Sequence, residues 1–289
     1  MKERLATRIA LLAPAQGLVL AVLLLPALYL VWLSLHASSF GQQAVFVGLA
    51  NYARILGDAY FWRSLANTGI IVLVVVHVEL LLGLGMALLF ASGVPMKRML
   101  LAVVLAPYAV SEVSAVVIWR YIFDPEVGHV SYLLQLLGLP SLDWAVSPAH
   151  GLLLVALLSI WLHLPFTFMI LYAARLAIPT ELYEAARIDG ATGWQAFRRV
   201  TLPLLVPAIL IAALFRLIFA FRLFSEVWLL TEGGPARTTE VVAVYLYLEA
   251  FRYNAFGAAA ATGWLMVLGS FLLAAPYLWR LARSQRADA

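Results

Sequence analysis

Long runs of apolar residues recur six times along this 289-residue chain and restrict what it can fold into. A helix needs roughly 20 apolar residues to cross about 30 Å of hydrocarbon, whereas a membrane β-strand needs only about half as many. The lengths of these runs therefore predict an all-α membrane protein with six transmembrane helices. The expected spans cover residues 9–35, 66–91, 99–121, 151–174, 203–230 and 257–280.

Composition agrees with a polytopic membrane protein. Hydrophobic residues make up 64% of the chain and charged residues 12%, with a mean hydropathy of +0.96, so too little polar surface remains for a soluble domain of this size. The chain has no cysteine, which excludes disulfides and thiolate-bound metals. The first apolar run is too long for the core of a cleavable signal. Without a repeat or a linker, residues 1–289 are expected to form one membrane domain.

Basic residues indicate the orientation. Six spans place both termini on one side, and Lys and Arg concentrate in short cytoplasmic loops. The termini together with loops 92–98 and 175–202 hold 12 basic residues, whereas loops 36–65, 120–150 and 231–256 hold five. The sequence thus predicts a multi-pass protein of a bacterial or archaeal cytoplasmic membrane with both termini in the cytoplasm. The net charge of +4 reflects this loop bias and does not indicate nucleic-acid binding.

The cytoplasmic stretch 179–203 is polar and has a helical pattern of its own. Thr180 is placed to cap a first helix, and Gly190 is placed to end it in a left-handed conformation. Thr192 is placed to cap a second helix, at whose C-terminal end Arg198 and Arg199 are expected to complement the helix dipole. The second helix carries Trp194, Phe197 and Val200 along one side and leads to Pro203 in the first turn of the next span. From the residues alone, a hairpin lying on the membrane surface and a docking site for a soluble partner are equally consistent with this pattern.

A resemblance favours the docking site. Glu184-Ala185-Ala186 is followed after three residues by Gly190, and after nine more by Val200-Thr201-Leu202-Pro203. This spacing resembles the EAA loop of the permease subunits of ABC importers, with Val200 where the family has Ile. Further matches resemble the carbohydrate-uptake class of maltose and glycerol-phosphate permeases, in particular the first of two non-identical permeases. They are Gly48-Leu49 with Asn51-Tyr52, Trp119 before Asp124-Pro125, Trp144, Trp161 with Pro165-Phe166, Ile188-Asp189-Gly190-Ala191, and Leu230-Thr231 with Gly233-Gly234-Pro235.

The resemblance implies the type I ABC importer permease fold with a cytoplasmic pair of coupling helices. It also implies partners: a second homologous permease, two copies of a cytoplasmic ATPase, an extracytoplasmic sugar-binding protein and the surrounding membrane lipid. ATP and Mg²⁺ are expected on the ATPase, since this sequence lacks a G-x-x-x-x-G-K-[ST] loop. This chain is therefore expected to be a transporter subunit without a cofactor or catalytic residues. The residues implied in ATPase docking are Glu184, Ala185, Ala186, Asp189, Gly190, Trp194, Leu202 and Pro203.

Ionisable residues at membrane depth usually face the bundle interior or a water-filled path. Those within the expected spans are His77, Glu79, Glu112, His163, Arg216, Arg222 and Glu226. One interpretation is structural: Arg222 and Glu226 stand four residues apart and pair on one helix face. The other is functional: the fifth span lines a substrate pathway formed by Phe221, Arg222, Phe224, Glu226 and Trp228. Relatives often have Phe-Asp where this chain has Phe224-Ser225-Glu226.

For Glu112, a hydrogen bond to the backbone at a span end, beside the helix-loosening Pro107, is the favoured interpretation. For His77 and His163, contacts within the bundle are favoured over ligand binding, and no metal-ligand spacing is present. On the outer side, Gly233, Gly234 and Pro235 form a turn that breaks the helix. These three residues and Trp144 are the expected contacts with the binding protein, although an interfacial aromatic belt also explains Trp144.

Two other functions are alternatives to the importer permease. A secondary carrier needs no docking loop and often has an internal repeat, which this sequence lacks. An integral membrane enzyme needs clustered catalytic groups, and the outer-loop Asp124, Glu126, His129, Asp143 and His150 fit no such spacing. A neutral sugar is the favoured substrate, with glycerol phosphate as the alternative because Arg216 and Arg222 are candidates to bind a phosphate.

Overall fold

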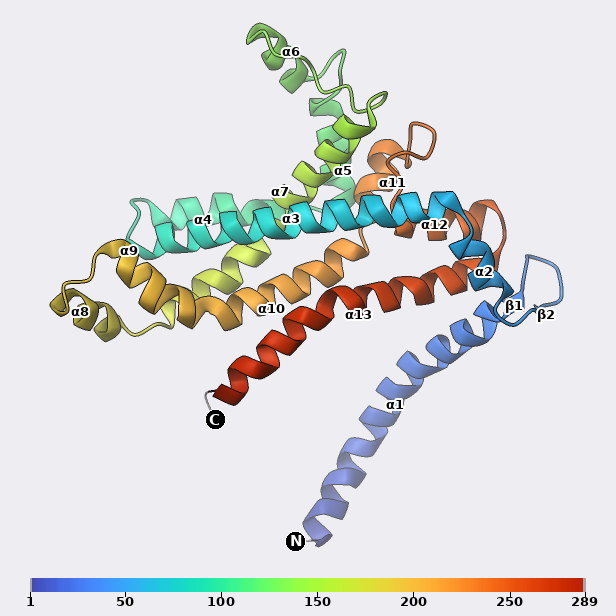
Figure 1. The fold of residues 1–289 in the computed structure, drawn as a ribbon, viewed down its shortest axis with the longest axis horizontal. Coiled ribbons are helices and arrows are strands. Elements are labelled where there is room, and N and C mark those ends of the chain that lie inside the picture. Colours follow the sequence, from blue (N-terminus) through green and yellow to red (C-terminus); the bar gives the residue numbers. More distant parts are fainter. Residues whose placement is uncertain (1, 288–289) are drawn as a thin grey trace. The chain divides into compact units, whose positions relative to one another are not determined.

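The computed structural model describes the backbone of residues 2–287 and the side chains of residues 12–280. It is mostly helical (Figure 1), which confirms the predicted fold class. The chain divides into two compact units, residues 1–61 with 245–267 and residues 62–244 with 268–289. The chain passes between these units three times, within α3 (Ala59–Ala91), α12 (Val242–Tyr247) and α13 (Phe256–Ala287).

The first unit contains α1 (Lys2–Ser34), a two-residue antiparallel pair formed by β1 (His36–Ala37) and β2 (Val45–Phe46), and α2 (Ala50–Leu56). Asn51 fastens α2 to the end of α1: its Nδ2 donates to the carbonyl oxygens of Ser34 at 2.8 Å and His36 at 3.0 Å. The neighbouring Tyr52 donates to the Ser34 hydroxyl at 2.9 Å. The Asn51-Tyr52 pair of the sequence therefore has a structural role, because it satisfies carbonyl groups that the end of α1 leaves open.

Residues distant in sequence complete this unit. They belong to the last part of α12 (Val242–Tyr247), the π-turn η3 (Leu248–Arg252) and the first part of α13. Arg54 forms an ion pair with Glu249, and Tyr245 donates to the Asp58 carboxylate at 2.8 Å. Burial, reinforced by this carboxylate, raises the pKa of Tyr245. Gly257 passes so close to the His36 carbonyl that a Cβ there has no room.

The second unit is a helical bundle around α7 (Pro148–Leu176) and α10 (Leu202–Phe221), which pack on each other. The short helix α11 (Ser225–Thr231) packs against α7 and α5. The remaining elements are α4 (Lys97–Leu105), the 3₁₀ turn η1 (Ala106–Ala109), α5 (Glu112–Ile122), α6 (His129–Leu136), α8 (Thr180–Ile188), α9 (Gly193–Ala196) and the π-turn η2 (Phe197–Thr201).

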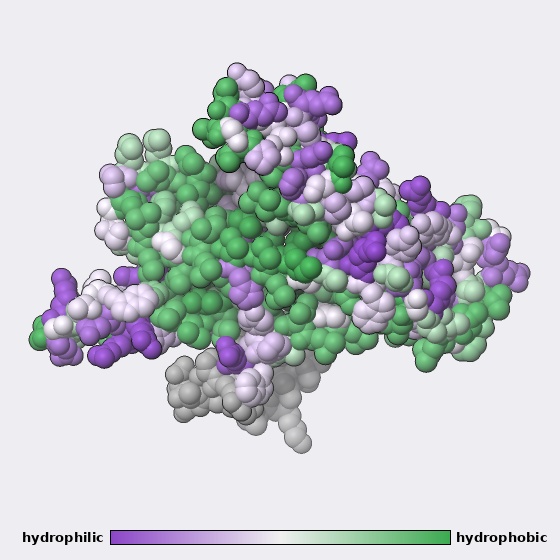
Figure 2. All heavy atoms as spheres, turned by 45° about the horizontal axis from the view of Figure 1, so that its top comes forward, coloured by the Kyte–Doolittle hydropathy of each residue, from purple (hydrophilic) through white to green (hydrophobic). Residues whose placement is uncertain are grey.

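Five of the described helices are long and apolar enough to cross a membrane, or up to six if a bent pair forms one span. They coincide with the segments expected from hydropathy. Large apolar side chains remain exposed on them, such as Leu81 at 71% and Leu272 at 77%, and hydrophobic residues spread over the visible face in Figure 2. Apolar surface of this extent indicates contact with lipid rather than water.

The third expected span, residues 99–121, is not one continuous helix. The chain forms α4 and η1, then bends by 100° before α5. Pro107 has no N–H to continue the α-helical ladder, and Val110 and Ser111 adopt extended conformations with ψ of 135° and 136°. The sequence analysis identified Pro107 as a residue that loosens the helix. It did not predict the break after Pro107, because the hydropathy of the segment is that of a continuous span.

The fifth expected span, residues 203–230, is also interrupted. Helix α10 ends at Phe221 and α11 begins at Ser225, with Arg222 and Phe224 outside helical geometry. The predicted pairing of Arg222 with Glu226 was therefore wrong, because the two residues do not share a helix face. None of the ion pairs among the described residues joins Arg222 to Glu226.

A buried ion pair joins α3 to α10. Arg216 and Glu79 are 1% and 0% exposed, and the guanidinium donates to both carboxylate oxygens, with Nη2 2.7 Å from Oε1. Bidentate geometry satisfies both groups where neither meets water. The sequence named both residues as intramembrane charges but assigned no partner to either.

A polar network fastens the loop after α11 to the N-terminal part of α3. Asn67 donates to the carbonyl oxygens of Thr238 and Glu240 at 2.8 and 2.9 Å, and Ser64 donates to the buried Glu240 carboxylate at 3.0 Å. Arg237 forms an ion pair with the same carboxylate, with Nη2 2.8 Å from Oε1. The loop is thereby held in one conformation despite its small residues.

We expect Arg216→Met to destabilise the protein by about 3–5 kcal/mol, because it leaves the Glu79 carboxylate buried without a partner. The double variant Glu79→Gln/Arg216→Met removes both charges and should regain most of this loss. Thermal unfolding of the purified protein in mild detergent measures the effect. Arg222→Met, which removes an exposed arginine, is the matched control; an equal loss in that variant would contradict the role of the pair.

Candidate functional site

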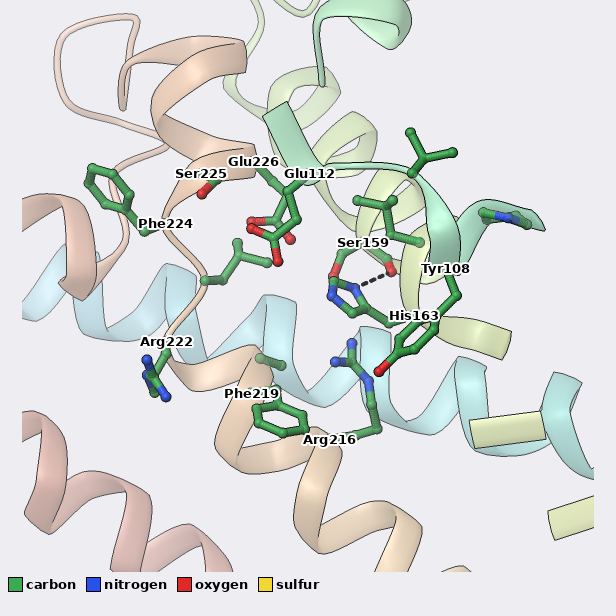
Figure 3. Close-up of a pocket in the computed structure, with 15 residues that line it drawn as sticks. Tyr108, Glu112, Ser159, His163, Arg216, Phe219, Arg222, Phe224, Ser225 and Glu226 are labelled. Atoms are coloured by element: carbon green, nitrogen blue, oxygen red, sulfur yellow. Dashed lines mark hydrogen bonds between the residues drawn. The ribbon is translucent and has the colours of Figure 1, made fainter. Parts of the chain in front are cut away.

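A polar cavity of about 750 Å³ lies where the two broken spans meet α7 (Figure 3). Its wall comes from η1, the start of α5, the middle of α7, the end of α10 and the start of α11. Both helix breaks contribute, because they turn the N-terminus of α5 and the connection between α10 and α11 toward the same space. The volume falls within the range of about 300–1,000 Å³ that ligand sites usually have.

Two carboxylates point into this cavity. Glu112 is the first residue of α5, Glu226 belongs to the first turn of α11, and Figure 3 shows their side chains pointing toward one another. Glu226 is 3% exposed, whereas Glu112 is exposed. Among the described residues no ion pair involves either of them. The interpretation of Glu112 as a backbone-bonded span end therefore gives way to a position in the cavity wall.

Ser159 and His163 supply neutral polar groups from α7. His163 Nδ1 donates to the Ser159 carbonyl oxygen at 2.9 Å, because a carbonyl can only accept. In the neutral ring this leaves Nε2 as an acceptor for a hydroxyl. The Ser159 hydroxyl oxygen is buried and has no hydrogen-bond partner among the described residues. Both groups suit a ligand rich in hydroxyls.

Aromatic rings line the same space. Tyr108, Phe219 and Phe224 belong to the cavity wall, and Trp228 stacks on Phe224 with ring centroids 6.1 Å apart. Phe221 points elsewhere: it is 2% exposed, and its ring lies 3.0 Å from the position of a Cβ at Gly269. Rings beside hydrogen-bonding groups form the combination that sugar sites commonly use.

Two arginines reach the cavity wall with different electrostatic effects. Arg216 is already neutralised by Glu79, so it presents a fixed dipole rather than a free positive charge. Arg222 is exposed at the end of α10 and points away from the two carboxylates in Figure 3. Glu112 and Glu226 place two acidic groups in the wall beside Arg222, the one lining arginine that no carboxylate of the described residues neutralises. The wall therefore has no excess of unpaired cations with which to bind an anion.

Of the five predicted pathway residues, Arg222, Phe224 and Glu226 line the cavity, Trp228 supports it through Phe224, and Phe221 packs elsewhere. The sequence named Glu112 and His163 without a substrate role and named Arg216 only as a candidate to bind a phosphate. It missed Tyr108, Ser159, Phe219 and Ser225. Pro107 was the one available signal for Tyr108, because a break at this depth exposes the residues beside it.

Loop 179–203 folds as two helical turns with defined ends. Gly190 has a φ of +74°, the Gly190 N–H donates to Arg187 at 3.0 Å, and the Ala191 N–H donates to Ala186 at 2.9 Å. These bonds form a Schellman motif, so the predicted role of Gly190 is confirmed. Thr192 caps α9 as predicted, within a capping box completed by Gln195. The prediction for Thr180 was wrong by one residue, because the cap position of α8 is Pro179.

The second turn does not end at Arg198 and Arg199, as the sequence suggested. Helix α9 continues through η2 into α10, giving one helical segment from Gly193 to Phe221. The wider π-turn accommodates Pro203, which cannot donate a backbone hydrogen bond. The expected dipole pairing of the two arginines therefore has no helix end to act on.

The residues implied in ATPase docking lie on this loop with different exposures. Glu184, Ala185, Asp189, Gly190 and Pro203 are exposed, and Trp194 is 68% exposed. Ala186 and Leu202 are half-buried. Figure 2 shows hydrophilic residues gathered at the end of the molecule that α8 forms. A polar, rigidly capped helix at the edge of an apolar bundle offers a surface for a soluble partner.

Two of the four expected binding-protein contacts are buried by the chain itself. The Trp144 ring is 6% exposed, donates from Nε1 to the Phe123 carbonyl at 2.8 Å and packs below Arg120. Gly233 is also buried, whereas Gly234 and Pro235 are half-buried. The Trp144 side chain therefore stabilises the loop that contains it and offers little surface to a partner.

The long apolar helices, the polar cavity between broken spans and the projecting helix pair together define a membrane transport subunit. Residues 79–280 match the family of binding-protein-dependent transport system inner membrane components, and this chain belongs to that family. It is a permease component of a transporter rather than an enzyme.

Several relatives are similar over most of their length. The trehalose/maltose transport system permease protein MalF of Thermococcus litoralis is 34% identical over 248 residues, which cover 86% of this chain and 83% of the relative. The trehalose transport system permease protein SugA of Mycobacterium tuberculosis is 36% identical over 233 residues, covering 80% and 74%.

A solved structure shows the same fold. A chain of a bacterial ABC transporter involved in the import of the acidic polysaccharide alginate aligns with a TM-score of 0.84 at 23% identity. The alignment covers 97% of this chain and 96% of the other. The likeness confirms the predicted type I importer permease fold.

We expect Glu184→Arg and Gly190→Trp to abolish transport while the protein stays in the membrane. The first reverses an exposed charge on α8, and the second forces a large side chain onto a backbone with φ of +74°. ATP-driven uptake and co-purification of the ATPase subunit measure the effects. Gly193→Ala is the matched control, since its Cβ meets open space at an ordinary φ. An undiminished ATPase subunit in both variants would refute the docking role.

Glu226→Gln keeps the size of the side chain but removes a carboxylate from the cavity. We expect about a tenfold change in the substrate concentration that half-stimulates ATP hydrolysis, because hydrogen bonds to a charged group contribute about 1.5–3 kcal/mol. Assembly with the partner subunits should be unchanged. A response equal to that of the wild type at all substrate concentrations would return Glu226 to a structural role.

Proposed function

We propose that this chain forms half of the translocation pathway of an ATP-driven importer for a neutral sugar. The observation that carries the proposal is the 750 Å³ cavity, which combines aromatic rings with hydroxyl, imidazole and carboxylate groups. Each hydroxyl of a sugar both donates and accepts hydrogen bonds, so this mixture suits it. The printed functions of two relatives, transport of trehalose/maltose and of trehalose, support a disaccharide as the first candidate.

The charges at the cavity argue against glycerol phosphate, the alternative substrate. A phosphate group needs an unpaired cation, and Arg216 is neutralised by Glu79. Only Arg222 remains, and a phosphate bound there would lie in a cavity that also contains Glu112 and Glu226. A neutral sugar needs no unpaired cation.

The partners in this proposal are a second homologous permease, two copies of a cytoplasmic ATPase and an extracytoplasmic sugar-binding protein. The ATPase binds ATP and Mg²⁺ and docks on the exposed face of α8 around Glu184 and Gly190. Gly234 and Pro235, together with the remaining outer loops, meet the binding protein. The termini and the loops on their side hold 12 basic residues, whereas the loops on the opposite side hold five. This distribution supports cytoplasmic termini in a bacterial or archaeal membrane.

Co-expression of this chain with the products of neighbouring genes tests the proposal. We expect the ATPase and a second permease to co-purify, and in proteoliposomes with the binding protein we expect trehalose or maltose to stimulate ATP hydrolysis and labelled sugar uptake. Glycerol phosphate is the matched charged substrate. Stimulation by glycerol phosphate alone would contradict the assignment of a neutral sugar, and purification of this chain without an ATPase would contradict the assembly.

A further inference from the structure

A second pocket, of about 490 Å³, lies between the ends of the spans and the cytoplasmic helix pair. It is separate from the polar cavity and shares none of its lining residues. Its wall joins the last residues of α3 and α7 to α8, α9 and η2. The residues that matter for its chemistry are Ser92, Arg175, Tyr183, Trp194, Phe197 and Thr201.

Arg175 brings a positive charge to this pocket that no carboxylate of the described residues neutralises. Its guanidinium carbon lies 4.4 Å from the centroid of the Tyr183 ring, and its Nε is buried without a hydrogen-bond partner among the described residues. Tyr183 is itself fixed by a 2.9 Å hydrogen bond between its hydroxyl and that of Thr201. A buried donor on a cation is costly unless an acceptor reaches it, so the arrangement is suited to an anionic ligand.

A second cation, Lys97 of α4, contacts α7 near Arg175. The Lys97 ammonium is 5.2 Å from the centroid of the Tyr172 ring, and Tyr172 stands three residues before Arg175 on α7. Three residues on a helix separate neighbours on one face. No acidic residue lines the pocket. The local charge is therefore positive on a part of the chain that also carries the exposed Arg198 and Arg199.

The pocket lies where the apolar spans end, which is the depth of lipid headgroups. Helix α3 ends at Ala91 and α7 at Leu176, one residue from Ser92 and Arg175 respectively. The exposed Trp194 stacks on Phe197 with ring centroids 5.3 Å apart. Tryptophan is enriched at this depth, and basic pockets between membrane helices on the cytoplasmic side bind lipid headgroups.

We propose that this pocket binds the phosphodiester headgroup of an anionic phospholipid, with Arg175 donating to the phosphate and Lys97 adding long-range attraction. The apolar side of the pocket, including Leu88 and Phe197, accommodates the start of an acyl chain. A soluble inorganic anion has no apolar part that could pack against this wall. The assignment of a lipid therefore accounts for both the charge and the apolar lining.

The bound lipid has a consequence for coupling, which rests on the proposed docking of an ATPase to α8. Tyr183 faces the pocket and Arg175, whereas its neighbour Glu184 is exposed. A lipid headgroup at Arg175 thus stabilises the inner face of the helix whose outer face meets the ATPase. Sugar-stimulated ATP hydrolysis should then require anionic lipid, even though no substrate group enters this pocket.

Native mass spectrometry of the purified complex from nanodiscs containing phosphatidylglycerol and phosphatidylcholine tests the binding directly. We expect the wild type to retain phosphatidylglycerol, and Arg175→Gln to retain it with roughly fivefold to tenfold lower affinity, because one charge-assisted contact is lost. Arg280→Gln, which removes one basic residue near the end of α13, is the matched control and should retain phosphatidylglycerol like the wild type. Equal retention in the wild type and Arg175→Gln would overturn the proposal.

Two further arms identify the source of the anion. Inorganic phosphate added to the complex in phosphatidylcholine nanodiscs should leave ATP hydrolysis unchanged; recovery of activity would indicate a soluble-anion site and overturn the lipid assignment. Arg175→Lys should retain part of the lipid affinity. Loss of the ATPase subunit from Arg175→Gln in every lipid would instead identify Arg175 as an ATPase contact, and would also overturn the proposal.

The measurement of lipid retention and the measurement of the response to sugar test the two proposals independently. Lipid retention is observed without any sugar, so a complex that transports another substrate still reports on this pocket. Conversely, a complex that responds to trehalose or maltose without retaining phosphatidylglycerol supports the proposed function and refutes the lipid site.

Discussion

The ion pair between Glu79 and Arg216 is the interaction on which the rest of the transport unit depends. Each charge alone costs several kcal/mol at this depth, and only a bidentate partner offsets that cost. The pair joins α3 to α10 and also sets the electrostatics of the cavity, since Arg216 belongs to its wall. Because Glu79 neutralises this guanidinium, Arg216 gives the cavity a strong polar donor without adding a free cation. That combination favours hydroxyl groups over phosphates.

The cavity itself results from two helix breaks that hydropathy cannot reveal. Residues on both sides of each break are apolar enough for a continuous span, so a hydropathy window averages over the extended residues at Val110 and Ser111 and over the connection at Arg222. Irregular backbone is tolerated at membrane depth only where it is buried in protein or lines a cavity. The breaks at 110–111 and 222–224 meet this condition, because both border the same polar space.

The sequence predicted the features that depend on local chemistry. Apolar length identified the spans, the spacing of Gly190 and Thr192 predicted both turns of the loop, and the basic residues suggested an orientation. The sequence did not predict contacts between distant segments. No local pattern relates Glu79 to Arg216, because the two residues are 137 positions apart. The pairing of Arg222 with Glu226 failed for a related reason: it assumed a continuous helix. Ser159 and Phe219 carry no local signal, since serine and phenylalanine occur throughout such helices.

Continuity from α9 to the end of α10 connects the proposed ATPase-docking loop with the cavity. The helical segment Gly193–Phe221 has 29 residues, about 43 Å at 1.5 Å per residue, and passes through the π-turn η2 and Pro203 where the loop enters the span. Its first turn is fixed by the capping box at Thr192, and its far end carries Arg216 and Phe219. Because this segment is continuous, the loop and part of the cavity wall belong to one helix, whereas the break at Arg222 separates α11 and Glu226 from it.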